Sequence, residues 1–197
     1  EQPHVIELLQ HETEGNALFV VEMARAERIG PQEAKSNLGV KRLPSTVKAV
    51  IRARLAILSE SAFELACFAA VIGREFTFDI LQRVSGKDED KLVRDLDELW
   101  QRRIVSEQGT EGYDFTHDKL REVVYTDLSA ARRRMLHHRV AQALQAQVRV
   151  PQSEVAALLA YHFEYAGEKD KAFEYWLNAG DHALQRYAPQ QAIQQFE

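Results

Sequence analysis

The chain has 197 residues, of which 45% are hydrophobic and 28% charged, a composition typical of a folded globular protein and not of a disordered one. Its formal net charge of −5 argues against nonspecific binding along a phosphate backbone, which requires a net positive face. The single cysteine, Cys67, rules out an internal disulfide and a cysteine-based zinc site, and favours a reducing cytoplasm. No apolar run approaches the roughly 20 residues that span a bilayer, so we expect no membrane contact.

The N-terminal part is predicted to be helical. Apolar stripes at residues 5–9 and 18–23 indicate two helices, and the second stops before the breaker pair Gly30-Pro31. The polar residues 31–43 are the best candidate for a loop or linker. A further helix is predicted to start at Pro44-Ser45.

The middle third has the pattern of a winged helix. Residues 61–73 form a nearly continuous apolar helix, residues 76–86 a short second helix, and Asp88 can cap a third. Two strand-like segments, 104–107 and 113–116, flank a turn-rich stretch and predict one β-hairpin. Because three helices followed by a hairpin is the order of a winged helix, we place this domain at residues 44–129.

The last third is predicted to form stacked helices. A long helix covers about 130–148, another opens at Pro151, and turns are expected at Gly167 and Pro189. Alternating aromatic and alanine positions suggest degenerate copies of a helix-turn-helix unit, as in tetratricopeptide (TPR)-like repeats. We therefore expect a mainly α fold whose residues 130–197 are TPR-like helical hairpins, truncated in mid-helix at Glu197.

No catalytic motif is present in the sequence. The only Gly-Lys pair, Gly86-Lys87, is followed by Asp88, so the phosphate-binding pattern GxxxxGK[ST] is absent. The seven histidines form no zinc-ligand pattern, and the paired acids Asp88 and Asp90 suit a helix start. We therefore expect no enzymatic activity from this chain alone, and no metal site.

A winged helix suggests DNA binding, but the charges argue against it. The predicted third helix, DEDKLVRDLDELWQRR, carries six acids (Asp88, Glu89, Asp90, Asp95, Asp97 and Glu98) against four bases, and the hairpin turn adds acids and no base. A second candidate is the basic cluster Arg132, Arg133, Arg134, His137, His138 and Arg139. We interpret this cluster as a solvated or inter-helix face, with Leu136, Val140 and Leu144 buried behind it.

Three segments carry a family resemblance. TEGNALFVVEMAR (residues 13–25) resembles the GNPLF lid motif of STAND-class signal-transduction ATPases, which are AAA+-related and include LuxR-type and cyclase-linked bacterial members. The segment entering their winged helix is similar to two stretches of this chain, LPSTVKAVIRARLAILS and the following ELACFAAVIGREFTFDILQRVSG. YDFTHDKLREVVYTDLSAARRRMLHHRVAQAL is similar to the block that closes that domain. The resemblance implies that residues 1–43 end the helical lid of an ATPase whose P-loop and magnesium site lie upstream.

The resemblance also implies candidate nucleotide-binding residues. Gly15, Asn16 and Ala17 match the lid motif, with Ala17 in place of its usual proline, and that motif approaches the nucleotide base. His117 and Asp118 resemble the MHD motif of related plant resistance and apoptosome-type proteins, where the histidine contacts the diphosphate of ADP. From the residues alone, Asn16 is a plain helix N-cap and His117 a partly buried histidine where a strand meets a helix.

The resemblance predicts a regulatory fragment that couples the ADP/ATP state of the parent protein to a helical sensor array. ADP or ATP with Mg²⁺ would bind the parent, and neither is expected to bind this chain alone. Expected partners are the upstream nucleotide-binding domain and a protein or small-molecule inducer at the repeats. The alternatives are a winged-helix transcription regulator that binds DNA and a TPR-like scaffold for protein–protein interaction.

Overall fold

The computed structural model describes residues 45–110, 112–146 and 152–185, and these residues are mainly helical. The described elements are α3 (Ser45–Leu55), α4 (Glu60–Ile72), β1 (Glu75–Thr77), α5 (Phe78–Ser85), α6 (Glu89–Gln101), β2 (Val105–Gln108), β3 (Gly112–Phe115), α7 (Asp118–Asp127), α8 (Ala130–Gln145), α9 (Gln152–Ala166) and α10 (Lys169–Gln185). The mainly α fold expected from the sequence is confirmed.

The chain divides into two compact units, Glu1–Leu58 and Ser59–Glu197. In the first unit, α3 buries Val47, Ile51 and Leu55 along one face, as the apolar spacing predicts. The predicted helices before residue 44, and the boundary between residues 43 and 44, lie outside the described residues. The structure groups α3 with the first unit, whereas our sequence division placed it with the winged helix.

Helix α4 is the centre of the second unit. Eight of its residues are buried, because its sequence is almost entirely apolar and small. The Ser59 side chain accepts a hydrogen bond from the Ala62 amide and so caps the N-terminus. At the other end, Gly73 ends the helix, and its N–H donates to Ala69. The helix contacts α5, α6, α7 and α8, so the surrounding elements share one core.

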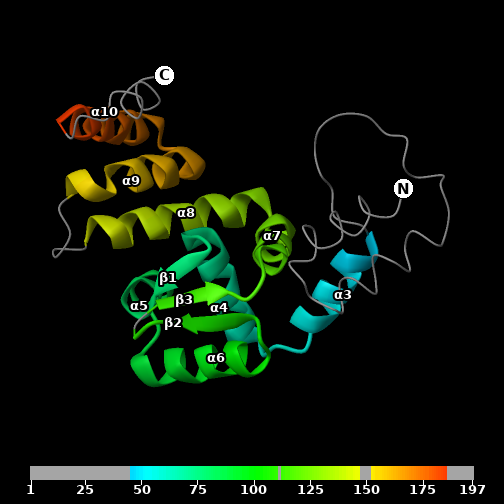
Figure 1. Ribbon diagram of the computed structural model, residues 1–197. Helices are drawn as coiled ribbons and strands as arrows, with labels where there is room; N and C mark the ends of the chain where they lie inside the picture. Colours follow the sequence, from blue (N-terminus) through cyan, green and yellow to red (C-terminus); the bar gives the residue numbers. More distant parts are fainter. Residues whose placement is uncertain (1–44, 111, 147–151, 186–197) are drawn as a thin grey trace, which may run out of the picture. The chain divides into compact units, whose positions relative to one another are not determined.

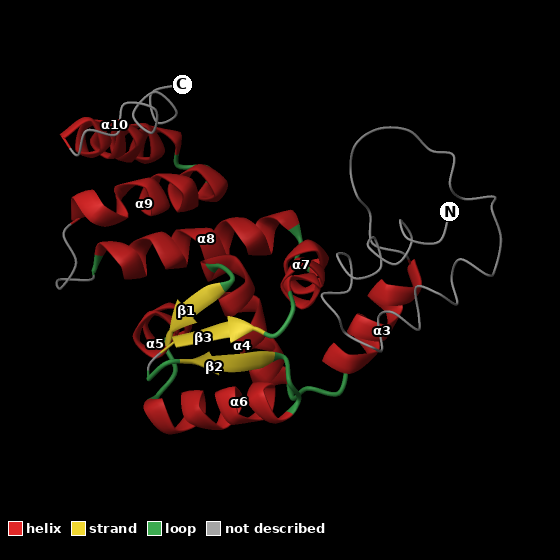
Figure 2. Cartoon of the chain, viewed as in Figure 1, coloured by secondary structure: helices red, strands yellow, loops and turns green. Residues whose placement is uncertain are grey.

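A three-stranded antiparallel sheet packs beside these helices, with strand order β1-β3-β2 (Figure 2). The predicted hairpin is present as β2 and β3, in which Val105 lies opposite Phe115. Strand β1 corrects our prediction, because we assigned Phe76 and Thr77 to the second helix and expected a hairpin only. Phe76 lies opposite Tyr113 of β3, their rings stack, and the helix begins at Phe78.

The order α4-β1-α5-α6-β2-β3 is that of a winged helix, with β2 and β3 as the wing and α6 in the position of the recognition helix. The predicted cap of α6 is confirmed, since Asp88 accepts from the Lys91 amide at 2.9 Å. Leu92, Leu96 and Leu99 form its buried face. These features hold α6 against α4 and β2.

Helix α9 packs on α8 and α10 packs on α9, and α8 also contacts α4 and α5 (Figure 1). The predicted turn at Gly167 is present, with a left-handed backbone (φ +86°) that favours glycine. The turn predicted at Pro189 lies outside the described residues. Leu136, Val140 and Leu144 are buried, as expected for the inner face of α8.

Candidate functional site

The junction between β3 and α7 contains the two described site residues that we predicted, His117 and Asp118. His117 is the N-cap residue of α7 and is partly exposed, and its side chain makes no capping hydrogen bond. Asp118 lies in the first turn, where a carboxylate interacts favourably with the helix dipole. The chain therefore places an imidazole and a carboxylate at the start of the helix that leads from the winged helix into the stacked helices.

Thr116 joins this junction to the turn between α6 and β2. Its amide donates to the carbonyl of Ile104 at 3.1 Å, and its hydroxyl contacts the carbonyls of Ile104 and Arg103. Arg103 has a left-handed backbone (φ 54°), which is uncommon for a residue with a side chain. The residue before His117 is thus fixed to the end of α6.

Arg74 holds the other side of the junction. Its Nη1 donates to the Asp118 carboxylate at 2.9 Å, and its carbonyl accepts from the Phe115 amide at 3.2 Å. Both side chains of the ion pair are about half exposed, so the pair contributes little to stability. Its effect is positional, because it places a guanidinium beside the start of α7.

Gly15, Asn16 and Ala17, the predicted lid residues, lie outside the described residues. The structure therefore brings together His117 and Asp118 and adds Arg74, which we did not predict from the sequence.

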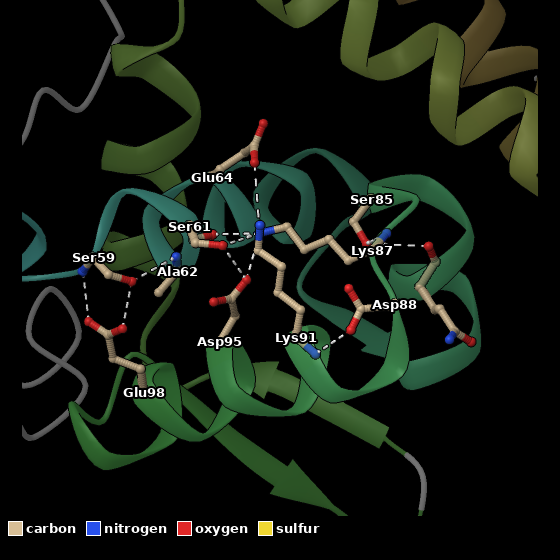
Figure 3. A network of polar contacts seen from close by, with 11 residues as sticks. Ser59, Ser61, Ala62, Glu64, Ser85, Lys87, Asp88, Lys91, Asp95 and Glu98 are labelled. Carbon is tan, nitrogen blue, oxygen red and sulfur yellow. Dashed lines mark hydrogen bonds and ion pairs between the residues drawn. The ribbon is translucent and has the colours of Figure 1, made fainter.

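A buried ion network fixes α6 to α4 (Figure 3). Lys87 Nζ donates to the carboxylate of Asp95 at 2.6 Å and to the hydroxyl and carbonyl oxygens of Ser61 at 2.8 Å. The side chains of Lys87 and Asp95 are only 7% and 8% exposed. The Ser61 hydroxyl donates to the same carboxylate, so both buried charges have hydrogen-bonding partners.

A second contact joins α6 to the start of α4. The Ser59 amide and hydroxyl both donate to the Glu98 carboxylate, each at 2.7 Å. Together with the buried Asp95, this contact means that two of the six acids in the predicted third helix are bound to partners within the domain. Asp95 is buried in the network, and Glu98 is bound to Ser59.

A pair of buried histidines lies where α7, α8 and α9 meet. His137 Nδ1 and His162 Nδ1 are 2.9 Å apart, and the Tyr125 hydroxyl lies 3.0 Å from His137 Nε2. Both imidazoles are fully buried, and His162 Nε2 has no hydrogen-bonding partner. The structure thus removes His137 from the basic surface cluster in which we had placed it, because its ring points into the helix stack.

Burial controls the protonation of this pair. It lowers the pKa of His137 to about 4, and the positive charge of Arg133 acts in the same direction. Burial also lowers the pKa of His162 to about 3, with a smaller contribution from His137. Both imidazoles are therefore neutral near pH 7.

Within the described residues, no group of three or more histidine, cysteine, aspartate or glutamate side chains is placed to hold a metal ion. Burial raises the pKa of the Cys67 thiol to about 11, so its reactive thiolate form is disfavoured. None of the described helices is both long and apolar enough to cross a membrane.

No known protein family, curated protein or solved structure gives a match to this chain.

Proposed function

We propose that this chain is a regulatory segment of a cytoplasmic, nucleotide-switched signalling ATPase. It couples the ADP or ATP state of an upstream domain, where Mg²⁺ also binds, to the stacked helices that sense an inducer. The segment contains no catalytic core of its own. The resemblance of the block around His117 to the closing motif of such ATPases supports this proposal.

The observation that carries the proposal is the arrangement at the β3–α7 junction. The His117 imidazole can donate a hydrogen bond to a phosphate oxygen, and the first amides of α7 favour an anion. Arg74 adds positive charge beside them, although Asp118 balances part of it.

The same junction is connected both to the winged helix and to the stacked helices α8–α10. Thr116 binds the turn after α6, while α7 packs on α4 and leads directly into α8. A phosphate bound at His117 in one nucleotide state only would therefore favour one arrangement of α7 relative to the upstream domain.

The test uses the intact parent protein, with the variant His117→Ala. A charge-assisted hydrogen bond to phosphate is worth about 1.5–3 kcal/mol, so ADP should dissociate about ten- to a hundredfold faster. Basal signalling should rise and ATP binding should persist. The matched control is His182→Ala on α10, which should leave the ADP off-rate unchanged. A lower melting temperature of His117→Ala with a wild-type ADP off-rate would contradict the proposal.

A further inference from the structure

We propose that the edge of α6 that faces the wing binds a basic amphipathic helix of a partner protein. This surface, called here the α6–wing surface, consists of Glu89, Val93, Asp97 and Trp100 on α6 together with Glu107 and Tyr113 on the wing. None of these six residues belongs to the β3–α7 junction, so this surface is separate from the proposed phosphate contact.

Two large apolar side chains are exposed on this edge. Trp100 is 53% and Val93 is 42% exposed, and their spacing of seven residues places them on the same side of the helix. The core face of α6 is formed by Leu92, Leu96 and Leu99. The exposed pair is therefore not needed to hold α6 in place. Tryptophan is also the residue type most often found at the energetic centre of protein interfaces.

Acidic side chains surround this apolar pair. Glu89 and Asp97 share its edge of the helix, and Glu107 lies exposed on β2. Burial, and then the nearby charges of Glu107 and Asp97, raise the pKa of Tyr113, so both carboxylates lie close enough to the phenol to affect it.

The basic residues of α6 lie elsewhere on the helix. Lys91 and Arg94 are turned about 100° or more around the helix axis from Val93. DNA would bring phosphates against the acids at the position of a recognition helix, which is unfavourable. A helix with apolar side chains between lysines or arginines would cover Trp100 and Val93 while pairing with these acids.

The surface is fixed before any partner binds. The Lys87–Asp95 pair and the Ser59–Glu98 contact hold α6 on α4 (Figure 3). In the wing, the Ser106 hydroxyl donates to Asp114 across the two strands. Since little ordering is needed on this side, binding costs less conformational entropy there.

The test is a titration with two synthetic helical peptides of leucine and alanine, one carrying lysines and the other glutamates at the same positions. The variant Trp176→Phe leaves Trp100 as the only tryptophan of this chain, so its fluorescence reports directly on the surface. We expect the lysine peptide to shift the Trp100 emission to the blue and the glutamate peptide to have no effect. Added salt should weaken the binding.

In the same background, Asp97→Lys/Glu107→Lys should weaken lysine-peptide binding at least about tenfold. The matched control, Glu174→Lys/Asp181→Lys, changes two exposed acids on α10 and alters the net charge equally, so it should retain binding. Trp100→Ala, made with Trp176 intact and a labelled peptide, should also lose binding while circular dichroism shows a folded chain.

Three outcomes would overturn the inference. The first is equal loss of binding in both charge-reversal pairs, which would mean that only net charge attracts the peptide. The second is tighter binding of duplex DNA than of the peptide by the unmodified chain. The third is self-association, measured by sedimentation, that Asp97→Lys/Glu107→Lys abolishes, because the surface would then belong to a second copy of this chain.

Discussion

The imidazoles of His137 and His162 meet through their Nδ1 atoms, 2.9 Å apart, where α9 packs on α8. A hydrogen bond between two ring nitrogens needs one that carries a proton and one that does not. When both rings are imidazolium, two N–H groups point at each other and the bond is lost. The packing of α9 on α8 is thus linked to the protonation of this pair.

This linkage predicts that the chain becomes less stable as the pH falls below about 6.5, the ordinary pKa of histidine. The folded-state pKa values are lowered to about 4 and about 3, so between pH 6.5 and 4 the unfolded chain binds protons that the folded chain does not. Each histidine then removes up to about 1.4 kcal/mol of stability per pH unit. Urea denaturation between pH 7 and 5 measures this slope.

The double variant His137→Phe/His162→Leu is the control for that measurement. It removes both titrating groups from the helix stack, so its free energy of unfolding should change much less between pH 7 and 5. A wild-type slope in the double variant would show that other groups cause the acid sensitivity.

Removing Lys87 should be strongly destabilising. Lys87→Met leaves the buried Asp95 carboxylate without its cation, and breaking a buried pair in this way costs about 3–5 kcal/mol. The double variant Lys87→Met/Asp95→Leu removes both charges and should recover much of that loss. Chemical denaturation measures the unfolding free energy of the wild type, both single variants and the double variant, which together give the coupling energy. If the changes in the two single variants simply add up in the double variant, Lys87 and Asp95 do not interact.

The wing should be sensitive to a methyl group at Gly112. A Cβ atom there would lie 2.6 Å from the backbone carbonyl oxygen of Gln108, its partner across the hairpin, so the strands must shift. We expect Gly112→Ala to cost about 1–3 kcal/mol, as overpacking does. Gly109→Ala meets no atom within 4 Å but must adopt φ +67°, at a cost of about 1–2 kcal/mol. Thermal unfolding followed by circular dichroism compares the two variants.

Amide hydrogen exchange should be slower in α4 than in α10. Helix α4 is surrounded by four other helices and buries eight residues, so its amides should exchange mainly through global unfolding. On α10, Phe173 and Leu184 are 64% and 51% exposed, and fewer apolar contacts oppose local opening. Mass spectrometry of peptides from both helices tests this, and equal protection would contradict it.

Much of this fold could be predicted because helix signals are local. The apolar run of α4, the Asp88 cap and the glycines that end α4 and α5 each act within a few residues. Strand β1 could not be predicted in the same way. Its three residues are too few to show alternation, and they form a strand only because β3, far along the sequence, lies beside them.

The candidate site was predictable only in part. His117 and Asp118 stand out at a strand–helix junction, whereas the partner Arg74 is distant in sequence. Asp95 had a signal that we did not use, because it occurs between Leu92 and Leu96 on the apolar face of its helix. A charge on such a face needs a buried partner, and its identity as Lys87 depends on the tertiary fold.

The strand order has a consequence for synthesis of the protein. Strand β1 pairs with β3 and not with β2, so all of α5, α6 and β2 is translated before β1 gains its partner. Until the ribosome releases β3, the Phe76 side chain of the nascent chain lacks the Tyr113 and Phe115 rings that cover it. The winged helix is therefore completed in one late step, after the whole wing has left the exit tunnel.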